Sequence, residues 1–231
     1  MKFNLFCFHF AGGSKYSYNS YAAAAPAGLN IVPVELPGRG ARSMEQPLSD
    51  IWLMVDDIFS QIRHSLHTPY AIYGHSLGSL LSYLVTIRIR QEGLNNPVHL
   101  FVSGRGGPSI PRKHPPTSEL PRPAFISKLK ELGGFPDDLL NDDNVMNFFE
   151  PILRSDFRGV ETYQYAGPAM LDLPITVMIG KEEKVSYEDA CEWKKETSND
   201  VQIKVFPGKH FFIFNYPREI VHIISSTLGL S

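Results

Sequence analysis

One pentapeptide constrains the fold of this chain more than any other feature. Gly74-His75-Ser76-Leu77-Gly78 directly follows an apolar run at residues 70–73. A G-x-S-x-G motif after a strand predicts a sharp strand-to-helix turn that holds the serine in a strained conformation with its hydroxyl exposed. Glycine has no Cβ, so such a turn can close against its neighbours. Apolar residues at helical spacing follow the motif, namely Leu77, Leu80, Leu81, Leu84 and Ile87. We therefore predict that Ser76 is a nucleophile; the alternative is an ordinary turn with a solvated serine.

Six short apolar runs predict the strands of one sheet. They are residues 3–8, 30–35, 70–73, 98–103, 175–179 and 201–206. Runs of this kind, separated by helical patterns, are typical of buried parallel strands. One such helix is expected to begin after Asp50, a residue suited to capping a helix N-terminus. The alternation predicts an α/β fold with a mainly parallel sheet, formed by residues 1–231 as a single domain.

The interval between the fourth and fifth runs breaks this rhythm. It opens with six prolines from Pro108 to Pro123, which disfavour regular structure. Two apolar stripes at helical spacing follow, and their members are Phe125, Leu129 and Leu132 in one and Val145, Phe148, Phe149, Ile152 and Leu153 in the other. An insertion here lies at the carboxyl ends of the strands. We predict a helical lid at approximately residues 108–165; the alternative is a helical decoration with no gating role.

Composition excludes several classes of protein. A net charge of −2 argues against nucleic acid as a partner, and no apolar run approaches the length of a membrane span. Residues 1–8 lack the long apolar region and cleavage site of a signal peptide and are interpreted as a strand. The two cysteines, Cys7 and Cys191, fit packing positions in a protein of the reducing cytoplasm. No exposed apolar stripe is evident, so we expect a monomer, and we expect no metal site.

A serine nucleophile needs a base, and the base needs an orienting acid. In this arrangement the chain order is serine, acid, histidine, and the histidine follows the last strand. His210 meets that condition because it comes just after Pro207 and Gly208. The acid should follow the strand at 175–179, where the chain offers Glu182 and Glu183 but no aspartate. We predict Glu183; Glu182 is the close alternative, and Asp156 or Asp189 would serve if the acid came from elsewhere.

Two backbone N–H groups are expected to form the oxyanion hole. One belongs to Leu77, the residue after the nucleophile. The other should come from the loop after the strand at residues 3–8, which contains Ala11 followed by two glycines. We predict Ala11 as the second donor, with Phe10 less favoured. A simple flexible turn is the alternative for this loop.

Several motifs together resemble one known family, the type II thioesterases of nonribosomal peptide and polyketide biosynthesis. In chain order, the motifs are the oxyanion loop at residues 8–13, Pro37-Gly38-Arg39-Gly40, the serine motif at 74–78, Leu132-Gly133-Gly134-Phe135-Pro136, the segment at 151–157, and Gly208-Lys209-His210-Phe211. His9 stands where the family usually has proline, and Glu183 where it usually has aspartate. The resemblance spans nearly the whole chain. It implies an α/β-hydrolase fold with strand order 2-1-3-4-5-6.

The resemblance also implies a reaction and a partner. The expected substrate is an acyl thioester on the phosphopantetheine arm of an acyl or peptidyl carrier protein domain. Ser76 would form an acyl-serine intermediate, and hydrolysis would clear stalled or misprimed intermediates from a synthase. No cofactor of its own is expected, because the arm arrives with the substrate. Other readings are a general carboxylesterase or lipase of the same fold, or a carrier-binding protein whose catalysis has decayed.

The start of the insertion suggests where a carrier could dock. Residues 105–130 contain six basic residues and one acidic residue, a net charge of +5. Because carrier proteins of these systems are typically acidic, this segment is expected to steer their approach. The alternative is a solvated loop whose charge is incidental.

Overall fold

Six parallel strands form one sheet in the computed structural model, which describes residues 2–111, 115–168 and 170–230. The order across the sheet is β2-β1-β3-β4-β5-β6, and every neighbouring pair is parallel. The strands are β1 (Phe3–Phe8), β2 (Leu29–Val34), β3 (Tyr70–His75), β4 (Leu100–Ser103), β5 (Ile175–Gly180) and β6 (Val201–Phe206). The predicted α/β fold and strand order are confirmed.

Strand ends differ slightly from the prediction. β3 runs on to His75, so the strand delivers the chain directly to Ser76. β4 begins at Leu100 rather than at residue 98, and Val98 is 44% exposed. β2 lies one residue earlier than expected at both ends. These shifts of one or two residues arise because hydrophobicity marks a buried segment better than it marks where ladder pairing begins.

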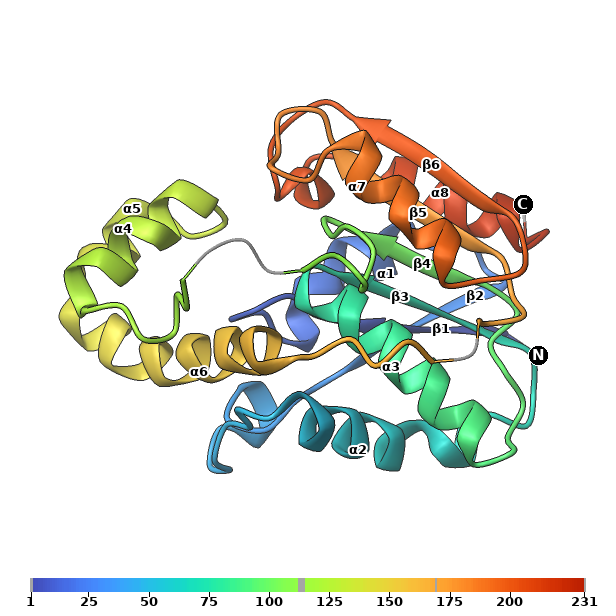
Figure 1. The fold of residues 1–231 in the computed structure, drawn as a ribbon, viewed down its shortest axis with the longest axis horizontal. Coiled ribbons are helices and arrows are strands. Elements are labelled where there is room, and N and C mark those ends of the chain that lie inside the picture. Colours follow the sequence, from blue (N-terminus) through green and yellow to red (C-terminus); the bar gives the residue numbers. More distant parts are fainter. Residues whose placement is uncertain (1, 112–114, 169, 231) are drawn as a thin grey trace.

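Helices cover both faces of the sheet (Figure 1). The helices are α1 (Asn19–Ala24), α2 (Ile51–Ile62), α3 (Leu77–Gln91), α4 (Arg122–Leu132), α5 (Asp137–Asn141), α6 (Asp143–Thr162), α7 (Tyr187–Cys191) and α8 (Pro217–Thr227). Alternate strand residues feed two cores, as the two-residue period of a strand requires. Phe6 and Phe8 of β1 join the core with α2 and α3, whereas Leu5 and Cys7 join the core with α1 and α8.

The N-terminus of α2 follows the sequence prediction. The Asp50 side chain accepts hydrogen bonds from Trp52 N–H and Leu53 N–H at 2.7 and 3.2 Å. These are two of the backbone donors that a helix start leaves without an intrahelical partner. Cys7 and Cys191 are both free thiols, and burial raises the pKa of Cys7 above its ordinary value. Within the described ranges, no helix combines the length and hydrophobicity needed to cross a membrane.

Helices α4, α5 and α6 occupy the interval between β4 and β5 and extend beyond the edge where the strands end (Figure 1). Their own small core holds Phe125, Leu129, Leu140, Met146 and Leu153. The stripe expected for α6 is wrong at Phe148, which is 53% exposed. Met146 is buried instead, because this part of α6 packs against α5 and α4 rather than against the sheet.

Candidate active site

Ser76 occupies the tip of the turn between β3 and α3, where the sequence places it. Its φ of 56° and ψ of −111° make it the one non-glycine residue with positive φ among those described. A Cβ on Gly74 would lie 2.1 Å from the carbonyl oxygen of Gly78, and one on Gly78 would lie 2.0 Å from that of Phe8. Because only glycine fits at both positions, close packing holds the serine in its strained backbone conformation.

His210 and Glu183 meet across two loops at the strand ends. The Nδ1 atom of His210, after β6, is 2.9 Å from Oε2 of Glu183, after β5. The Oε1 atom of Glu183 accepts a 2.6 Å hydrogen bond from the N–H of Gly180. The Glu183 side chain is only 1% exposed. A carboxylate fixed in this way holds Nδ1–H as the donor and leaves Nε2 of the imidazole available to a proton.

The three other carboxylates considered for this role do not contact His210. Glu182 is exposed on the same turn. Asp156 is buried against Arg39 and the N–H of Gly12. Asp189 accepts a hydrogen bond from the N–H of Ser186 at the start of α7. Of the four predicted candidates, therefore, the fold brings Glu183 to the histidine.

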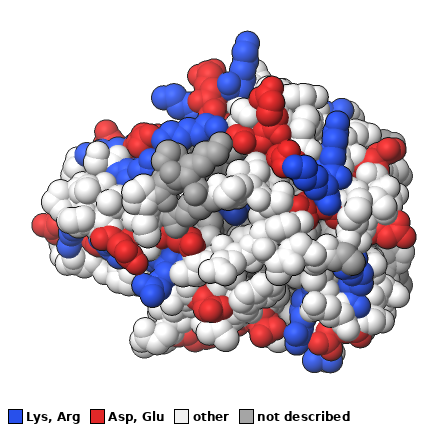
Figure 2. All heavy atoms as spheres, viewed as in Figure 1, with Lys and Arg blue, Asp and Glu red and all other residues white. Residues whose placement is uncertain are grey.

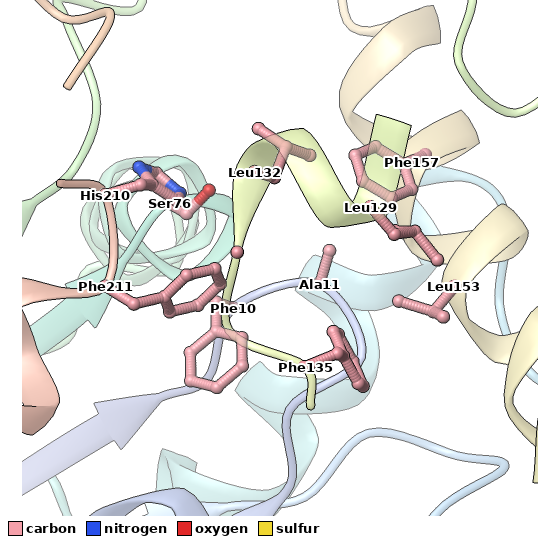
Figure 3. Close-up of a pocket in the computed structure, with 11 residues that line it drawn as sticks. Phe10, Ala11, Ser76, Leu129, Leu132, Phe135, Leu153, Phe157, His210 and Phe211 are labelled. Carbon is pink, nitrogen blue, oxygen red and sulfur yellow. The ribbon is translucent and has the colours of Figure 1, made fainter. Parts of the chain in front are cut away.

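Ser76 and His210 line the same cavity, and Figure 3 shows the serine hydroxyl beside the imidazole. Among the described residues, the Ser76 hydroxyl has no hydrogen-bond partner, so the two side chains are adjacent without being joined. Contacts of this kind are often long before substrate binds and tighten in the reacting complex. The arrangement supplies a nucleophile, a base and an oriented acid within one site.

The predicted oxyanion donors belong to the residue after Ser76 and to a loop residue that lines the same cavity. Leu77 opens α3, and the first N–H of a helix has no acceptor within that helix. Ala11 lines the cavity with Ser76, and its N–H has no protein acceptor in the part of the chain that the structure describes. The next N–H, that of Gly12, donates to Asp156 at 2.7 Å. This contact anchors the loop that presents Ala11.

The cavity at Ser76 has a volume of about 160 Å³ and an apolar wall. Figure 3 shows side chains from the β1 loop, α4, α6 and the His210 loop converging on it. The apolar lining residues are Phe10, Ala11, Leu129, Leu132, Phe135, Leu153, Phe157 and Phe211. An apolar wall beside a nucleophile suits an acyl chain. Among the described residues, no three His, Cys, Asp or Glu side chains are placed to hold a metal ion.

His75 is a contributor that the sequence reasoning did not single out. It is fully buried, its ring lies 4.8 Å from that of His210, and its Nδ1 atom is 2.9 Å from Oγ of Ser103. Burial, reinforced by the positive charge that His210 can carry, holds the pKa of His75 well below its ordinary value. His75 therefore stays neutral and packs against the imidazole of His210 with the two rings tilted by 42°. The sequence feature that could have pointed to His75 is its position inside the G-x-S-x-G motif.

Arg39 and Asp156 form a buried ion pair that the sequence analysis did not predict. The guanidinium donates to both carboxylate oxygens at 2.7 and 2.8 Å, and both side chains are almost fully buried. Asp156 lies on α6, whereas Arg39 follows β2. The same carboxylate holds Gly12, so α6 is tied to the loop beside Ser76. Both residues lie in motifs that carry the family resemblance, but neither motif indicates that the two side chains meet.

His9 packs in the core rather than lining the cavity. It is 2% exposed, and its Nδ1 atom lies 2.9 Å from the carbonyl oxygen of Phe10. Burial is the main cause that lowers its pKa to about 4, with the charge of Arg39 adding to the effect. His9 is therefore neutral near pH 7 and leaves His210 as the histidine beside Ser76.

Two of the six basic residues in the segment at 105–130 form ion pairs with acidic side chains. Arg122 pairs with Asp143 and Glu150, and Lys128 pairs with Glu131. Arg112 and Lys113 lie outside the described residues. Figure 2 shows acidic and basic side chains interspersed over this view of the molecule. Arg122 is paired with acids of α6 and Lys128 with an acid of its own helix, so these two charges are offset locally.

Comparisons with known proteins show the family of this chain and structures with a similar fold. The model of the thioesterase domain family matches residues 3–228. The chain is 34% identical to the gramicidin S biosynthesis protein GrsT of Aneurinibacillus migulanus, over 99% of this chain and 90% of GrsT. The structure of ClbQ from the colibactin NRPS/PKS pathway superposes with a TM-score of 0.94 at 27% identity, covering 99% of this chain and 98% of ClbQ. The type II thioesterase BorB from the borrelidin biosynthetic cluster superposes with a TM-score of 0.90 at 30% identity, covering 98% and 92%.

Proposed function

This chain belongs to the thioesterase domain family, and we propose that it is a type II thioesterase that hydrolyses acyl thioesters carried by synthase carrier proteins. The observation that carries the proposal is the hydrogen bond from His210 to Glu183 beside Ser76, at the mouth of an apolar cavity. Relatives of similar length that belong to nonribosomal peptide and polyketide pathways support the assignment. The role is to release acyl groups that stall or misprime a carrier.

The residues divide the chemistry in two steps. Ser76 Oγ attacks the thioester carbonyl carbon as His210 Nε2 accepts its proton, and Glu183 stabilises the imidazolium that results. The N–H groups of Leu77 and Ala11 stabilise the oxyanion of the tetrahedral intermediate. Collapse of the intermediate breaks the C–S bond, and His210 returns the proton to the departing sulfur.

Water completes the cycle. His210 takes a proton from a water molecule that attacks the acyl-Ser76 carbonyl, and then returns it to Ser76 Oγ as the acid is released. The balance is one water consumed, one carboxylic acid formed and one carrier thiol restored. Thiolates are good leaving groups, so the site needs less acid assistance than one that expels an amine.

The substrate brings the reactive arm with it. We propose that the phosphopantetheine arm of an acyl or peptidyl carrier domain reaches the cavity between the core and helices α4 to α6, which act as a lid. No resident cofactor or metal takes part in this scheme. Apolar side chains of α4 and α6, among them Leu129 and Phe157, would hold the acyl chain while the thioester carbonyl lies at Ser76.

Hydrolysis of an acetyl-phosphopantetheinyl carrier protein tests the proposal. We expect turnover by the wild type, and loss of turnover in Ser76→Ala. The matched oxygen ester should be a poorer substrate than the thioester. Faster hydrolysis of the oxygen ester would instead identify a general carboxylesterase. Carrier binding without turnover or serine labelling by a fluorophosphonate would identify a non-catalytic binding protein.

A further inference from the structure

A second and larger cavity adjoins the one at Ser76. Its volume is about 710 Å³, and the two cavities share Leu132 and Phe157 as walls. The rest of its lining comes from the loop after β4, the ends of α4 and α6, and Lys184 after β5. A substrate held at Ser76 therefore lies next to the larger cavity, across the side chains of Leu132 and Phe157.

Arg105 lines this larger cavity, and hydrogen bonds on either side of it fix its backbone. The preceding residue, Gly104, donates its N–H to Met178 O at 2.9 Å, and the carbonyl of Arg105 accepts from Trp193 Nε1 at 3.0 Å. A hydrogen bond of 2.8 Å from Ser76 N–H to Ser103 O ties the same end of β4 to the nucleophile turn. The end of β4 therefore both contacts the turn at Ser76 and positions Arg105.

The other charged residues in the described lining of this cavity already have partners. Lys128 and Lys184 both pair with Glu131. Glu161 accepts hydrogen bonds from Thr117 N–H at 2.6 Å and from Ser118. Arg105 differs from them because, in the described part of the chain, its guanidinium has neither an ion pair nor a hydrogen bond, and its Nε atom is buried.

Even a partly buried cation without a counter-charge is costly, and proteins normally pair it. Burial lowers the pKa of Arg105 to about 10, so the group still carries its charge at neutral pH. The planar guanidinium offers a fork of donors that matches a carboxylate or phosphate. The large cavity in front of it leaves room for such a group to approach.

We propose that Arg105 and the surrounding cavity form an anion-binding subsite that recognises an oxyanion carried by the substrate. This inference rests on the proposed thioesterase function. It adds the chemical class of the substrate group that the second cavity binds. Two parts of the substrate carry that chemistry: a carboxylate at the far end of the acyl group, and the phosphate of the phosphopantetheine arm.

Three thioesters separate these sources: hexanoyl-pantetheine, its adipoyl analogue with a terminal carboxylate, and hexanoyl-4′-phosphopantetheine. The measured quantity is kcat/KM for each anionic substrate divided by that for hexanoyl-pantetheine. We expect one of the two ratios to fall about tenfold or more in Arg105→Gln, since a hydrogen bond to a charged partner is lost. Arg105→Lys, which keeps the charge, should show a smaller fall in the same ratio. Lys130→Gln is the control, because this lysine is exposed on α4 and does not line the cavity, and it should leave both ratios unchanged.

The outcome identifies the source or overturns the subsite. A fall in the adipoyl ratio assigns the acyl carboxylate, and a fall in the phosphopantetheine ratio assigns the phosphate. Ratios that are the same in wild type and Arg105→Gln overturn the subsite, while turnover of hexanoyl-pantetheine by the wild type leaves the thioesterase function standing. If no thioester is turned over by the wild type, the proposed function itself fails.

Inhibition of the wild type tests the same inference if Arg105→Gln does not fold. Adipate and inorganic phosphate are compared with chloride at matched ionic strength, with hexanoyl-pantetheine as substrate. Competitive inhibition by either anion supports the subsite. Absence of inhibition by both, together with no preference for either anionic thioester, overturns it.

Discussion

The Asp156 carboxylate on α6 accepts both hydrogen bonds of the Arg39 guanidinium fork, at 2.7 and 2.8 Å, in a nearly solvent-free position. The same carboxylate accepts the N–H of Gly12, one residue beyond the proposed oxyanion donor Ala11. One side chain therefore connects three segments that are distant in the sequence. Through this connection, the position of α6 affects the position of the loop beside Ser76.

Removing the charge of Asp156 should destabilise the fold and disturb catalysis together. Asp156→Asn leaves the Arg39 guanidinium buried without its counter-ion, which we expect to cost about 3 kcal/mol in the free energy of unfolding. Urea denaturation measures this cost. Asp143→Asn is the control, because Asp143 also pairs with an arginine but its side chain is 90% exposed. An equal loss in both variants would contradict the assigned importance of the buried pair.

The two neighbouring glutamates should differ sharply in their effect on turnover. Glu183→Gln removes the carboxylate that orients His210, and we expect kcat to fall by about 10³-fold or more. Glu182→Gln changes an exposed side chain and should retain nearly all activity. Steady-state hydrolysis of one acyl-carrier substrate by both variants measures the difference. Equal rates in the two variants would remove Glu183 from the proposed triad.

Substitutions at Ser76 should separate catalysis from backbone strain. Ser76→Ala and Ser76→Gly both lack the nucleophile and should not turn over substrate. Only glycine relieves the positive φ of 56°, so we expect Ser76→Gly to be more stable than Ser76→Ala by about 1 kcal/mol. Thermal and urea unfolding compare the two inactive proteins directly. If alanine were as stable as glycine, the turn would not be storing strain.

Protonation of His9 should weaken the fold in mild acid. The folded-state pKa of about 4 lies below the ordinary value of 6.5, so the unfolded chain binds the proton more tightly. The stability contributed by neutral His9 is present above pH 6.5 and is lost as the pH falls toward 4. At pH 5 the loss amounts to about 2 kcal/mol. His9→Gln should reduce the change in unfolding free energy between pH 7 and pH 5 by that amount, with His64→Gln at an exposed position as the control.

The wall of the cavity at Ser76 should set the preferred acyl length. Phe135→Ala removes a ring from this wall, and we expect kcat/KM for long acyl thioesters to rise relative to short ones by about tenfold. Phe148→Ala, in the same group of helices, removes an exposed ring and should leave the preference unchanged. A series of acyl chain lengths measures both variants. A shift of the same size in Phe148→Ala would argue against the cavity as the acyl site.

Much of the candidate site could be predicted from short stretches of the sequence. The order of strands and helices follows from the spacing of apolar residues, because each buried element must present a continuous apolar face. Ser76 and His210 could be chosen because both stand in short motifs next to strand ends. Their backbone positions are fixed by neighbours in the chain, chiefly the glycines that permit the elbow at Ser76. The choice of the orienting acid could be narrowed only to Glu182 and Glu183, since both follow the same strand.

Contacts between distant segments were decided by the tertiary structure. Which glutamate reaches His210 depends on how the turn after β5 packs against the loop after β6. Similarly, Asp156 was a candidate acid in the sequence, yet it lies buried against Arg39, 117 positions away. The sequence by itself determined the elements and the turn that carries Ser76, because these depend on local backbone preference and hydrophobic period. Only the folded chain decided the partners of each charge, because a charge is paired by whichever opposite group packing brings within a few ångströms of it.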